Sequence, residues 1–413
     1  MLERCFKSSS TLHRLRGGPA GPFLAGLAQA LADEGYQANT IVYYVRAGEH
    51  LAVWADRHGT ALPDLDDALV ARFVLHLPRC RCCTRRARSR SVPFMVHRFV
   101  RYLRETGVVT TPAAEPMRSP LMAEYGAWMR DQRGLAATTI ARSLRMVQAL
   151  LDTMGDDPAE FDATGVRGFV LEHIRKHAPA SAGLVTTGVR CFLRWLVAQG
   201  RCPTDLAEAV PKVPTWRLAK LPRYLADDDV ERIIKACVRP SPVARRDRAM
   251  LLLLARLGLR ASDVVGLRLG DIDWRQARIR VVGKGKRETR LPLPQDVGDA
   301  ILAYLEAERH AAATDRVFLT ARTPIRPIGS SGLRGVTWRA IERAGVQVPS
   351  RGTHVLRHSL ATKLLREGVT LDAIGAVLRH RDVNTTALYA KVDIAALRQV
   401  AQPWPCAEDV SPC

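Results

Sequence analysis

The chain has 413 residues, enough for two or three domains, and its composition is ordinary for a globular protein. Lys and Arg number 62 against 41 Asp and Glu, so the net charge of +21 favours a polyanionic partner such as nucleic acid; an arginine-rich solvated surface is the alternative, and charge alone does not separate the two. No apolar run is long enough to cross a bilayer, and the N-terminus lacks the apolar core of a signal peptide. We therefore expect a cytoplasmic protein without a membrane partner. The first twenty residues are basic and contain serines, so we expect a frayed terminus there.

The N-terminal half contains a weak internal repeat. Three pairs of segments share a pattern: 35–41 with 134–140, 72–74 with 168–170, and 98–103 with 191–196. Apolar residues recur every three or four positions in each copy, which predicts four short amphipathic helices. Gly107 and Gly200 suit the position just after a helix end. We therefore expect two helical modules in series, residues 1–111 and 117–203.

Nine cysteines are present, and in a cytoplasmic chain we expect them to be reduced. Cys80, Cys82 and Cys83 lie in a basic segment near His76 and His97. Adjacent cysteines are poorly spaced as zinc ligands, and no second cysteine pair follows. We predict a basic loop with incidental thiols here, and neither a metal nor a cofactor.

A proline-rich, basic connector follows the second module at residues 204–224. Prolines make such a segment stiff. Lys212, Arg217 and Lys220 are candidates for contacts with a nucleic-acid backbone, and a plain interdomain linker is the compatible alternative.

A third, mostly helical domain is predicted over residues 225–394. Strands at 277–282 and 288–293 would form an antiparallel hairpin whose loop carries Lys284, Lys286 and Arg287. Helices are expected at 230–237 with Asp227 as N-cap, and at 247–259, 261–267, 295–309, 331–344, 354–367, 371–378 and 385–390, the last capped around Asn384. Residues 395–413 would form a tail that docks on a neighbouring protomer or folds back on its own domain.

Five residues of this domain are suited to cutting a phosphodiester without a metal. The guanidinium groups of Arg260 and Arg357 match pairs of phosphate oxygens and stay charged. His354 precedes Arg357 by three residues, so the two side chains share a helix face. His380 and Tyr389 are close enough in the chain to face one cleft. Each residue alone is weak evidence, since a lone tyrosine is usually a core residue, but the ordered combination is specific.

Four sequence boxes in this domain resemble those of the tyrosine recombinases, the phage integrase family. They are residues 258–267 around Arg260, 282–293 around Lys284, 353–362 with the His-x-x-Arg pair, and 378–389 ending in Tyr389. Residues 117–203 resemble the core-binding domain of this family. The resemblance implies a mainly α fold: helical SAM-like core-binding modules followed by a mixed α/β catalytic domain with a small antiparallel sheet.

The resemblance also implies the role of each matched residue. Tyr389 would attack the scissile phosphate and form a 3′-phosphotyrosyl bond, while Arg260 and Arg357 clamp that phosphate. Lys284 would protonate the leaving 5′ oxygen, and His354 would act as general acid and base. His380 would donate a hydrogen bond to the phosphate, and Asp263 would brace the first arginine box. Lys286 is a rival for the lysine role.

One departure from the family pattern concerns Arg379, which stands where a glycine is usual. Glycine adopts a left-handed turn that arginine resists, so we expect either a differently built helix end before His380 or an Arg379 that contacts phosphate. The extra N-terminal module, residues 1–111, resembles additions in transposon-type members and would be an accessory DNA-binding module of a mobile-element recombinase.

The sequence thus predicts a site-specific recombinase or integrase that cuts and rejoins double-stranded DNA in the bacterial nucleoid. It would act as a tetramer on two sites, without metal or ATP, alone or with partner recombinases. Two alternatives stay open: a type IB topoisomerase-like nicking and closing enzyme, and a catalytically inactive DNA-binding regulator.

Overall fold

The computed structural model describes the whole chain except residues 81–90, 112–118, 177–178, 203–205, 214–220, 238–240, 242, 284–287, 310–313, 351, 381, 393–396, 399–400 and 402–413. Contacts divide it into two compact units, the first formed by Met1–Ala32 and Gln37–Arg217, the second by Asp33–Tyr36 and Leu218–Cys413. The boundary after Arg217 falls inside the proline-rich connector.

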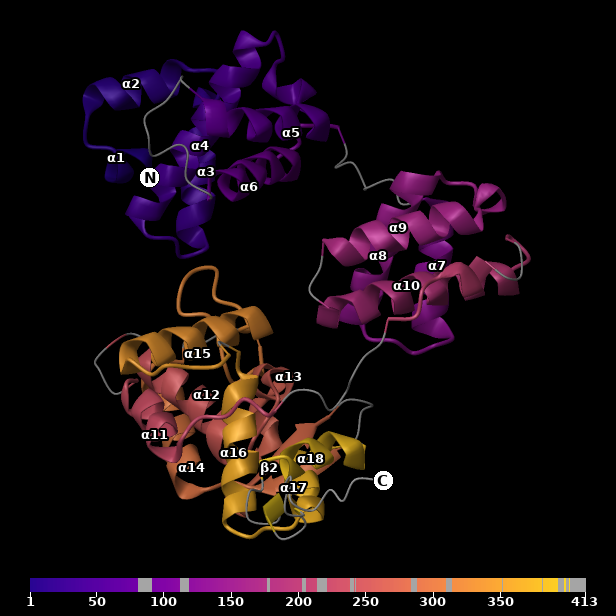
Figure 1. The fold of residues 1–413 in the computed structure, drawn as a ribbon. Helices are drawn as coiled ribbons and strands as arrows, with labels where there is room; N and C mark the ends of the chain where they lie inside the picture. Colours follow the sequence, from indigo (N-terminus) through magenta and orange to yellow (C-terminus); the bar gives the residue numbers. More distant parts are fainter. Residues whose placement is uncertain are drawn as a thin grey trace, which may run out of the picture. The chain divides into compact units, whose positions relative to one another are not determined.

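The first helical module is built around two crossing helices, α4 and α6. Its elements are α1 (Leu2–Cys5), α2 (Ser9–Gly17), α3 (Gly21–Asp33), α4 (Ala38–Arg57), η1 (Leu62–Asp64), α5 (Asp67–His76), η2 (Leu77–Arg79) and α6 (Val92–Glu105) (Figure 1). A Cβ atom added to Gly48 of α4 would lie 2.9 Å from the ring of Phe99 on α6, so glycine permits this close approach.

The prediction of a frayed N-terminus is wrong. Helices α1 and α2 occupy most of the first twenty residues, and Leu2, Phe6 and Leu15 are buried. These scattered apolar side chains were too sparse to predict a helix, but burial against the rest of the module orders them.

The second helical module has the four helices that the repeat predicted, although two of them are long. It comprises α7 (Pro120–Asp131), α8 (Ala137–Met154), η4 (Pro158–Glu160), α9 (Ala163–Arg175), α10 (Pro179–Ala198) and η5 (Leu206–Ala209). Tyr125, Phe192 and Trp195 pack ring against ring in its core. Gly107 and Gly200 both have left-handed φ angles, of 73° and 67°, just beyond α6 and α10, which confirms their predicted role as helix-ending residues.

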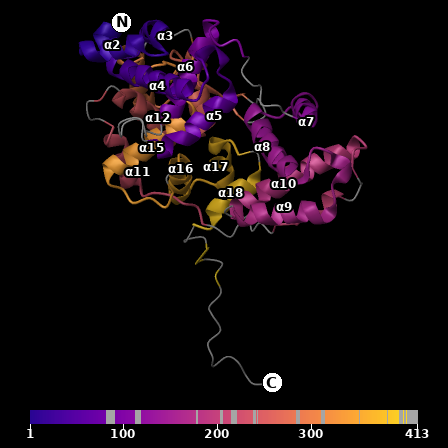
Figure 2. The ribbon, with the colours of Figure 1, turned by 90° about the horizontal axis from the view of Figure 1, so that it is seen from above.

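The second unit combines a helical core with a small sheet. Its elements are α11 (Asp227–Lys235), α12 (Ala244–Arg256), α13 (Ala261–Gly266), η6 (Leu269–Asp271), β1 (Ile272–Asp273), β2 (Arg278–Val282), β3 (Glu288–Pro292), α14 (Gln295–Ala307), α15 (Ser330–Ala344), α16 (His354–Arg366), α17 (Leu371–Leu378) and α18 (Val383–Ala390). Helix α12 is buried along most of its length and packs against α14 and α16. Helices α16, α17 and α18 lie side by side (Figures 1 and 2).

The sheet has the strand order β1-β2-β3, and both strand pairs are antiparallel. The β2–β3 hairpin was predicted, whereas the two-residue strand β1 was too short to recognise. The mainly α fold with a small antiparallel sheet is thereby confirmed.

Two predicted helix caps are wrong. Asp227 is the first residue of α11, and the N-cap is Ala226, which makes no side-chain cap. Helix α18 begins at Val383, so Asn384 lies inside it. Acidic residues in a first helical turn still stabilise the helix through its dipole, which explains why Asp227 suits its actual position.

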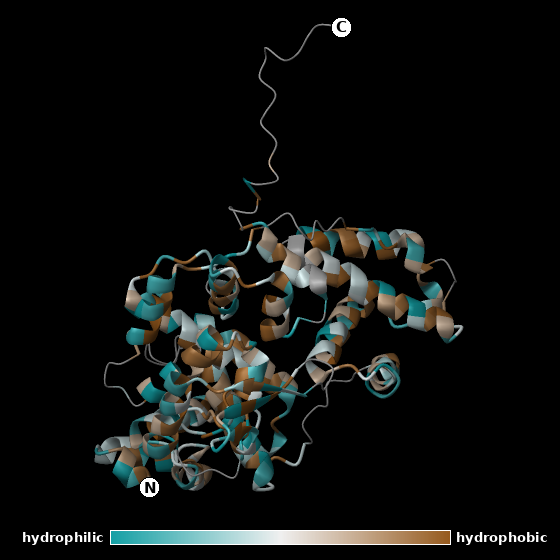
Figure 3. Ribbon diagram, turned by 90° about the horizontal axis from the view of Figure 1, so that it is seen from below, coloured by the Kyte–Doolittle hydropathy of each residue, from teal (hydrophilic) through white to brown (hydrophobic). Residues whose placement is uncertain are grey.

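The helices of both units are amphipathic, with hydrophilic and hydrophobic residues alternating around each ribbon (Figure 3). No helix in the described part of the chain is both long enough and apolar enough to cross a membrane.

Candidate active site

Arg260 is placed by the turn that connects α12 to α13. Gly258 has a left-handed φ of 57°, and a Cβ atom there would lie 2.7 Å from the Leu378 side chain at the end of α17. Arg260 is the N-cap of α13, and its backbone N–H donates to Oδ2 of Asp263 at 3.1 Å. The Arg260 guanidinium donates in turn to the carbonyl oxygen of Arg379 at 2.9 Å.

Arg357 lies on the first turn of α16 and is 5% exposed. Its two terminal nitrogens donate to the carbonyl oxygens of Gly258 and Leu378. Both predicted clamp arginines are therefore oriented by backbone carbonyls around the C-terminal end of α17. His354 begins α16, one turn from Arg357, as the spacing predicted.

Arg379 forms the turn after α17 in a left-handed conformation, with φ 54° and ψ 49°. The expectation that arginine would force a differently built helix end is therefore wrong. The Arg379 guanidinium donates to Oδ2 of Asp263 at 2.8 Å, and its side chain is 9% exposed. This ion pair offsets the cost of the left-handed backbone, which is about 1–2 kcal/mol for a non-glycine residue.

Asp263 and Arg379 together brace Arg260 from two sides. Asp263 accepts from both the Arg260 backbone and the Arg379 guanidinium, while Arg379 supplies the carbonyl that accepts from the Arg260 side chain. Nε and Nη1 of Arg379 are buried without a hydrogen-bond partner among the described residues. Contact between Arg379 and phosphate stays a prediction.

Tyr389 lies in a small apolar cluster with Ala361, Ile374 and Leu378, and it is only 1% exposed. Its Oη atom is 2.8 Å from Nδ1 of His358, and its ring lies parallel to that of His380 with centroids 6.3 Å apart. Nδ1 of His380 is within hydrogen-bonding distance of the Thr386 hydroxyl, at 2.8 Å. The phenol, both clamp arginines and three histidines thus occupy one region of the second unit.

Partial desolvation and the neighbouring arginines hold the imidazoles of His354, His358 and His380 neutral. Desolvation, followed by the charges of Arg357 and Arg260, lowers the pKa of His380 to about 4. Desolvation is also the main cause that lowers the pKa of His358 to about 4, and it lowers that of His354. A neutral imidazole is able to accept a proton, so these residues are poised as bases in the absence of DNA.

Desolvation also shifts the pKa values of Tyr389 and Arg357. Desolvation raises the pKa of Tyr389 to about 12, although the charge of Arg357 opposes the shift. Desolvation and the charge of Arg260 lower the pKa of Arg357 to about 10, so Arg357 stays protonated at neutral pH. The phenol is therefore protonated in this arrangement, and its Oη atom is shielded from solvent.

His358 is the residue that the sequence prediction missed. Its signal was its position four residues after His354, which places both imidazoles on one face of α16. The two rings lie 6.5 Å apart between centroids.

Several predicted site residues lie outside the described residues. They are Lys284, Lys286, Arg287, Arg217 and Lys220. Lys212 is described and exposed, and it stays a candidate for DNA contact.

Two arginines, a buried tyrosine and clustered imidazoles thus lie together in the second unit, the combination that the sequence boxes predicted for a DNA strand-transfer enzyme. The family model of the phage integrase family matches residues 223–395. The chain is 38% identical over 399 residues to the protein named "Putative integrase/recombinase y4rA" of Sinorhizobium fredii, covering 95% of this chain and 97% of that one. It is 31% identical over 289 residues to tyrosine recombinase XerC of Azotobacter vinelandii, covering 67% and 93% of the two chains.

The fold is also similar to a solved structure, the XerH site-specific recombinase bound to its palindromic difH substrate. The TM-score is 0.53 at 17% sequence identity, and the match covers 69% of this chain and 97% of that one. The chain belongs to the phage integrase family of tyrosine recombinases. It is a site-specific recombinase or integrase, an enzyme that breaks and rejoins DNA.

Proposed function

We propose that Tyr389 is the nucleophile of this recombinase and forms a 3′-phosphotyrosyl intermediate. The observation that carries this proposal is the convergence of Tyr389, Arg260, Arg357 and the imidazoles on one region, with Oη of Tyr389 at 2.8 Å from an imidazole nitrogen. Among the tyrosines of the second unit, Tyr389 is the one that stacks on His380 within the residues described there.

The proposed step conserves atoms and charge. Oη of Tyr389 bonds to phosphorus while the bond from phosphorus to the 5′ oxygen breaks, and Lys284 gives a proton to that oxygen. Arg260 and Arg357 turn from their carbonyl acceptors toward the non-bridging oxygens, where they stabilise the extra charge of the pentavalent state. Rejoining is the same step in reverse, so the bond energy is retained and ATP is not consumed.

The phenolic proton passes to an imidazole in this scheme. His358 accepts it in the arrangement seen here, because Nδ1 of the neutral ring faces Oη. His354 and His380 then contact the phosphate as donors, since an anion beside them favours their protonated forms.

The remaining parts of the chain are proposed to position DNA. Residues 117–203 would be the core-binding domain and residues 1–111 an accessory DNA-binding module, joined through the connector 204–224 to the catalytic domain 225–394. Four protomers would bring two sites together, with the tail 395–413 as a candidate contact between them. Magnesium is not required in this scheme, because cationic side chains supply the charge.

The proposal is tested by measuring the covalent adduct between the protein and DNA. DNA flanking the gene provides candidate substrates, and the adduct is measured by denaturing gel electrophoresis without added magnesium. Tyr389→Phe should abolish the adduct while DNA binding persists. Tyr304→Phe, at a buried tyrosine of the same unit outside the site, is the matched control and should retain it.

An adduct that survives Tyr389→Phe would reassign the nucleophile. Relaxation of supercoiled DNA without paired sites would favour the topoisomerase-like alternative. Tight binding without any adduct in the unaltered chain would favour an inactive regulator.

A further inference from the structure

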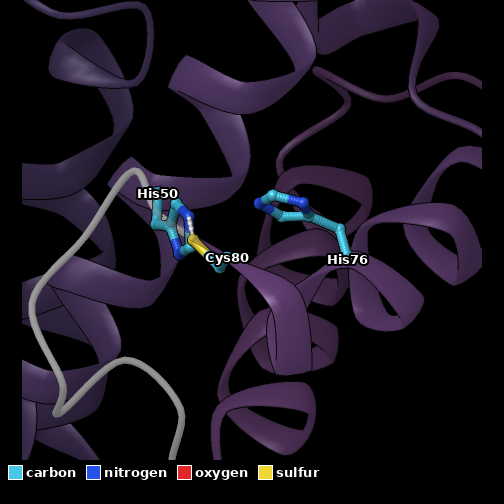
Figure 4. A group of neighbouring side chains, drawn as sticks. All are labelled: His50, His76 and Cys80. Atoms are coloured by element: carbon cyan, nitrogen blue, oxygen red, sulfur yellow. Dashed lines mark hydrogen bonds between the residues drawn. The ribbon is translucent and has the colours of Figure 1, made fainter.

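His50, His76 and Cys80 converge in the first helical module, which belongs to a different unit from the residues assigned to DNA cleavage. His50 lies in α4, His76 is the last residue of α5, and Cys80 follows η2. Their ligand atoms all lie within 4.8 Å of one another (Figure 4). The sequence analysis weighed Cys80 and His76 together with Cys82, Cys83 and His97, did not include His50, and predicted no metal. Cys82 and Cys83 lie outside the described residues, and His97 is exposed on α6.

The spacing of these atoms is close to that of a tetrahedral metal site. Zinc bonds of about 2.3 Å to sulfur and 2.0–2.1 Å to nitrogen place two such ligands roughly 3.5 Å apart. Sγ of Cys80 lies 3.5 Å from Nε2 of His50. The remaining pairs of ligand atoms lie within 4.8 Å, so a contraction of at most about 1.3 Å would bring them to the same separation.

The surroundings suit a partly buried metal site that water can reach. Cys80 is fully buried, and the His50 ring packs edge-on against Phe73 with centroids 4.9 Å apart. Trp54 and His76 lie 5.8 Å apart between ring centroids.

Comparison with the second helical module argues that His50, His76 and Cys80 are not required merely to pack the core. By the internal repeat, Ala149 corresponds to His50, while Glu172 and Lys176 correspond to His76 and Cys80. Glu172 and Lys176 form an exposed ion pair at 2.5 Å, and Ala149 packs at the edge of the core. A module of this pattern therefore folds without the two histidines and the thiol.

We propose that His50, His76 and Cys80 bind one zinc ion that links α4 to the end of α5. Two imidazole nitrogens and one thiolate are ligands that zinc prefers, and water completes the tetrahedron. Cys80 releases its thiol proton on binding. The ion acts as a structural clamp on the module and takes no part in the chemistry of Tyr389.

The experiment uses the full, untagged chain. After growth with zinc and dialysis, elemental analysis should find about one zinc per chain. His76→Ala and Cys80→Ser should lose it, while His97→Ala and Cys202→Ser, a half-buried thiol of the second module, should keep it. Chelation should lower the unfolding temperature of the unaltered chain and leave that of Cys80→Ser unchanged.

A second measurement does not depend on the folding of any variant. Cobalt(II) added to the metal-free, folded wild-type chain should produce a thiolate-to-metal charge-transfer band with one-to-one stoichiometry. A folded chain that gives no such band, or a zinc content unaffected by Cys80→Ser, would overturn the proposal. Because DNA cleavage is not part of either readout, these outcomes are independent of the function proposed for Tyr389.

Discussion

Half-buried imidazoles gather in two regions of this protein, and their neighbours differ in charge. In the catalytic unit, His358 and His380 lie near Arg357 and Arg260. In the first helical module, His50 lies beside a second imidazole and the Cys80 thiol. Burial lowers the pKa of the imidazole in both places to about 4.

The comparison shows that burial alone does not decide what a histidine cluster binds. A neutral imidazole serves equally as a proton acceptor or as a metal ligand. Two guanidinium groups beside it repel a cation and attract phosphate, whereas a thiol beside it becomes a thiolate only when a cation is bound. The neighbouring side chains therefore select an anion in one region and a cation in the other.

The largest effect should come from removing the anion-selecting charges. Arg260→Ala or Arg357→Ala should slow adduct formation about 10²–10³-fold, the usual loss for one donor to a developing negative charge. Arg256→Ala is a matched control, because Arg256 pairs with Glu231 and Asp296 outside the site. Adduct rates measured by quench and gel should be near normal in Arg256→Ala. A wild-type rate in either clamp variant would contradict the clamp.

His358→Ala should reduce the rate of adduct formation about 10²-fold at neutral pH, as expected for loss of a positioned base. The deficit should shrink at alkaline pH, where hydroxide takes the phenolic proton. The pH–rate profiles of wild type and variant on one DNA substrate provide the measurement. Parallel profiles would mean that His358 only holds the resting tyrosine.

Two substitutions at Arg379 distinguish the effect of its left-handed backbone from the effect of its side-chain ion pair. Arg379→Ala loses the ion pair with Asp263 and keeps the left-handed strain, so adduct formation should fall about ten-fold, equivalent to about 1.4 kcal/mol. Arg379→Gly loses the same ion pair but relieves the strain, and it should be about 1 kcal/mol more stable than Arg379→Ala. Urea unfolding of both variants tests this, and equal stabilities would show that the turn is unstrained.

The smallest effect concerns acid stability. The folded-state pKa of His50, His358 and His380 is about 4, below the usual 6.5, so the unfolded chain binds more protons between these values. Their contribution to the free energy of unfolding should be complete above pH 6.5 and should be lost as the pH falls toward about 4. Urea unfolding at several pH values across this range measures how steeply the free energy of unfolding changes with pH. Bound zinc should make the contribution of His50 steeper, because protons then compete with the metal.

Local patterns made much of the fold and site predictable. Helix α17 spans Leu371–Leu378, the predicted range, because its apolar periodicity and the Thr370 cap are both local signals. The order of Arg260, His354, Arg357, His380 and Tyr389 likewise predicted a shared cleft, since each residue is held near the end of a predicted helix.

What the sequence by itself determined is therefore the set of helices, the hairpin, the family boxes and the chemical types of the site residues. These follow from hydrophobic period, turn residues and short motifs, which act over a few positions. Only the tertiary structure decided that Arg379 adopts a left-handed turn and pairs with Asp263, 116 positions away, or that His50 meets Cys80, 30 positions on. Such pairings depend on how helices pack, and packing is set by the shapes and burial of many side chains at once.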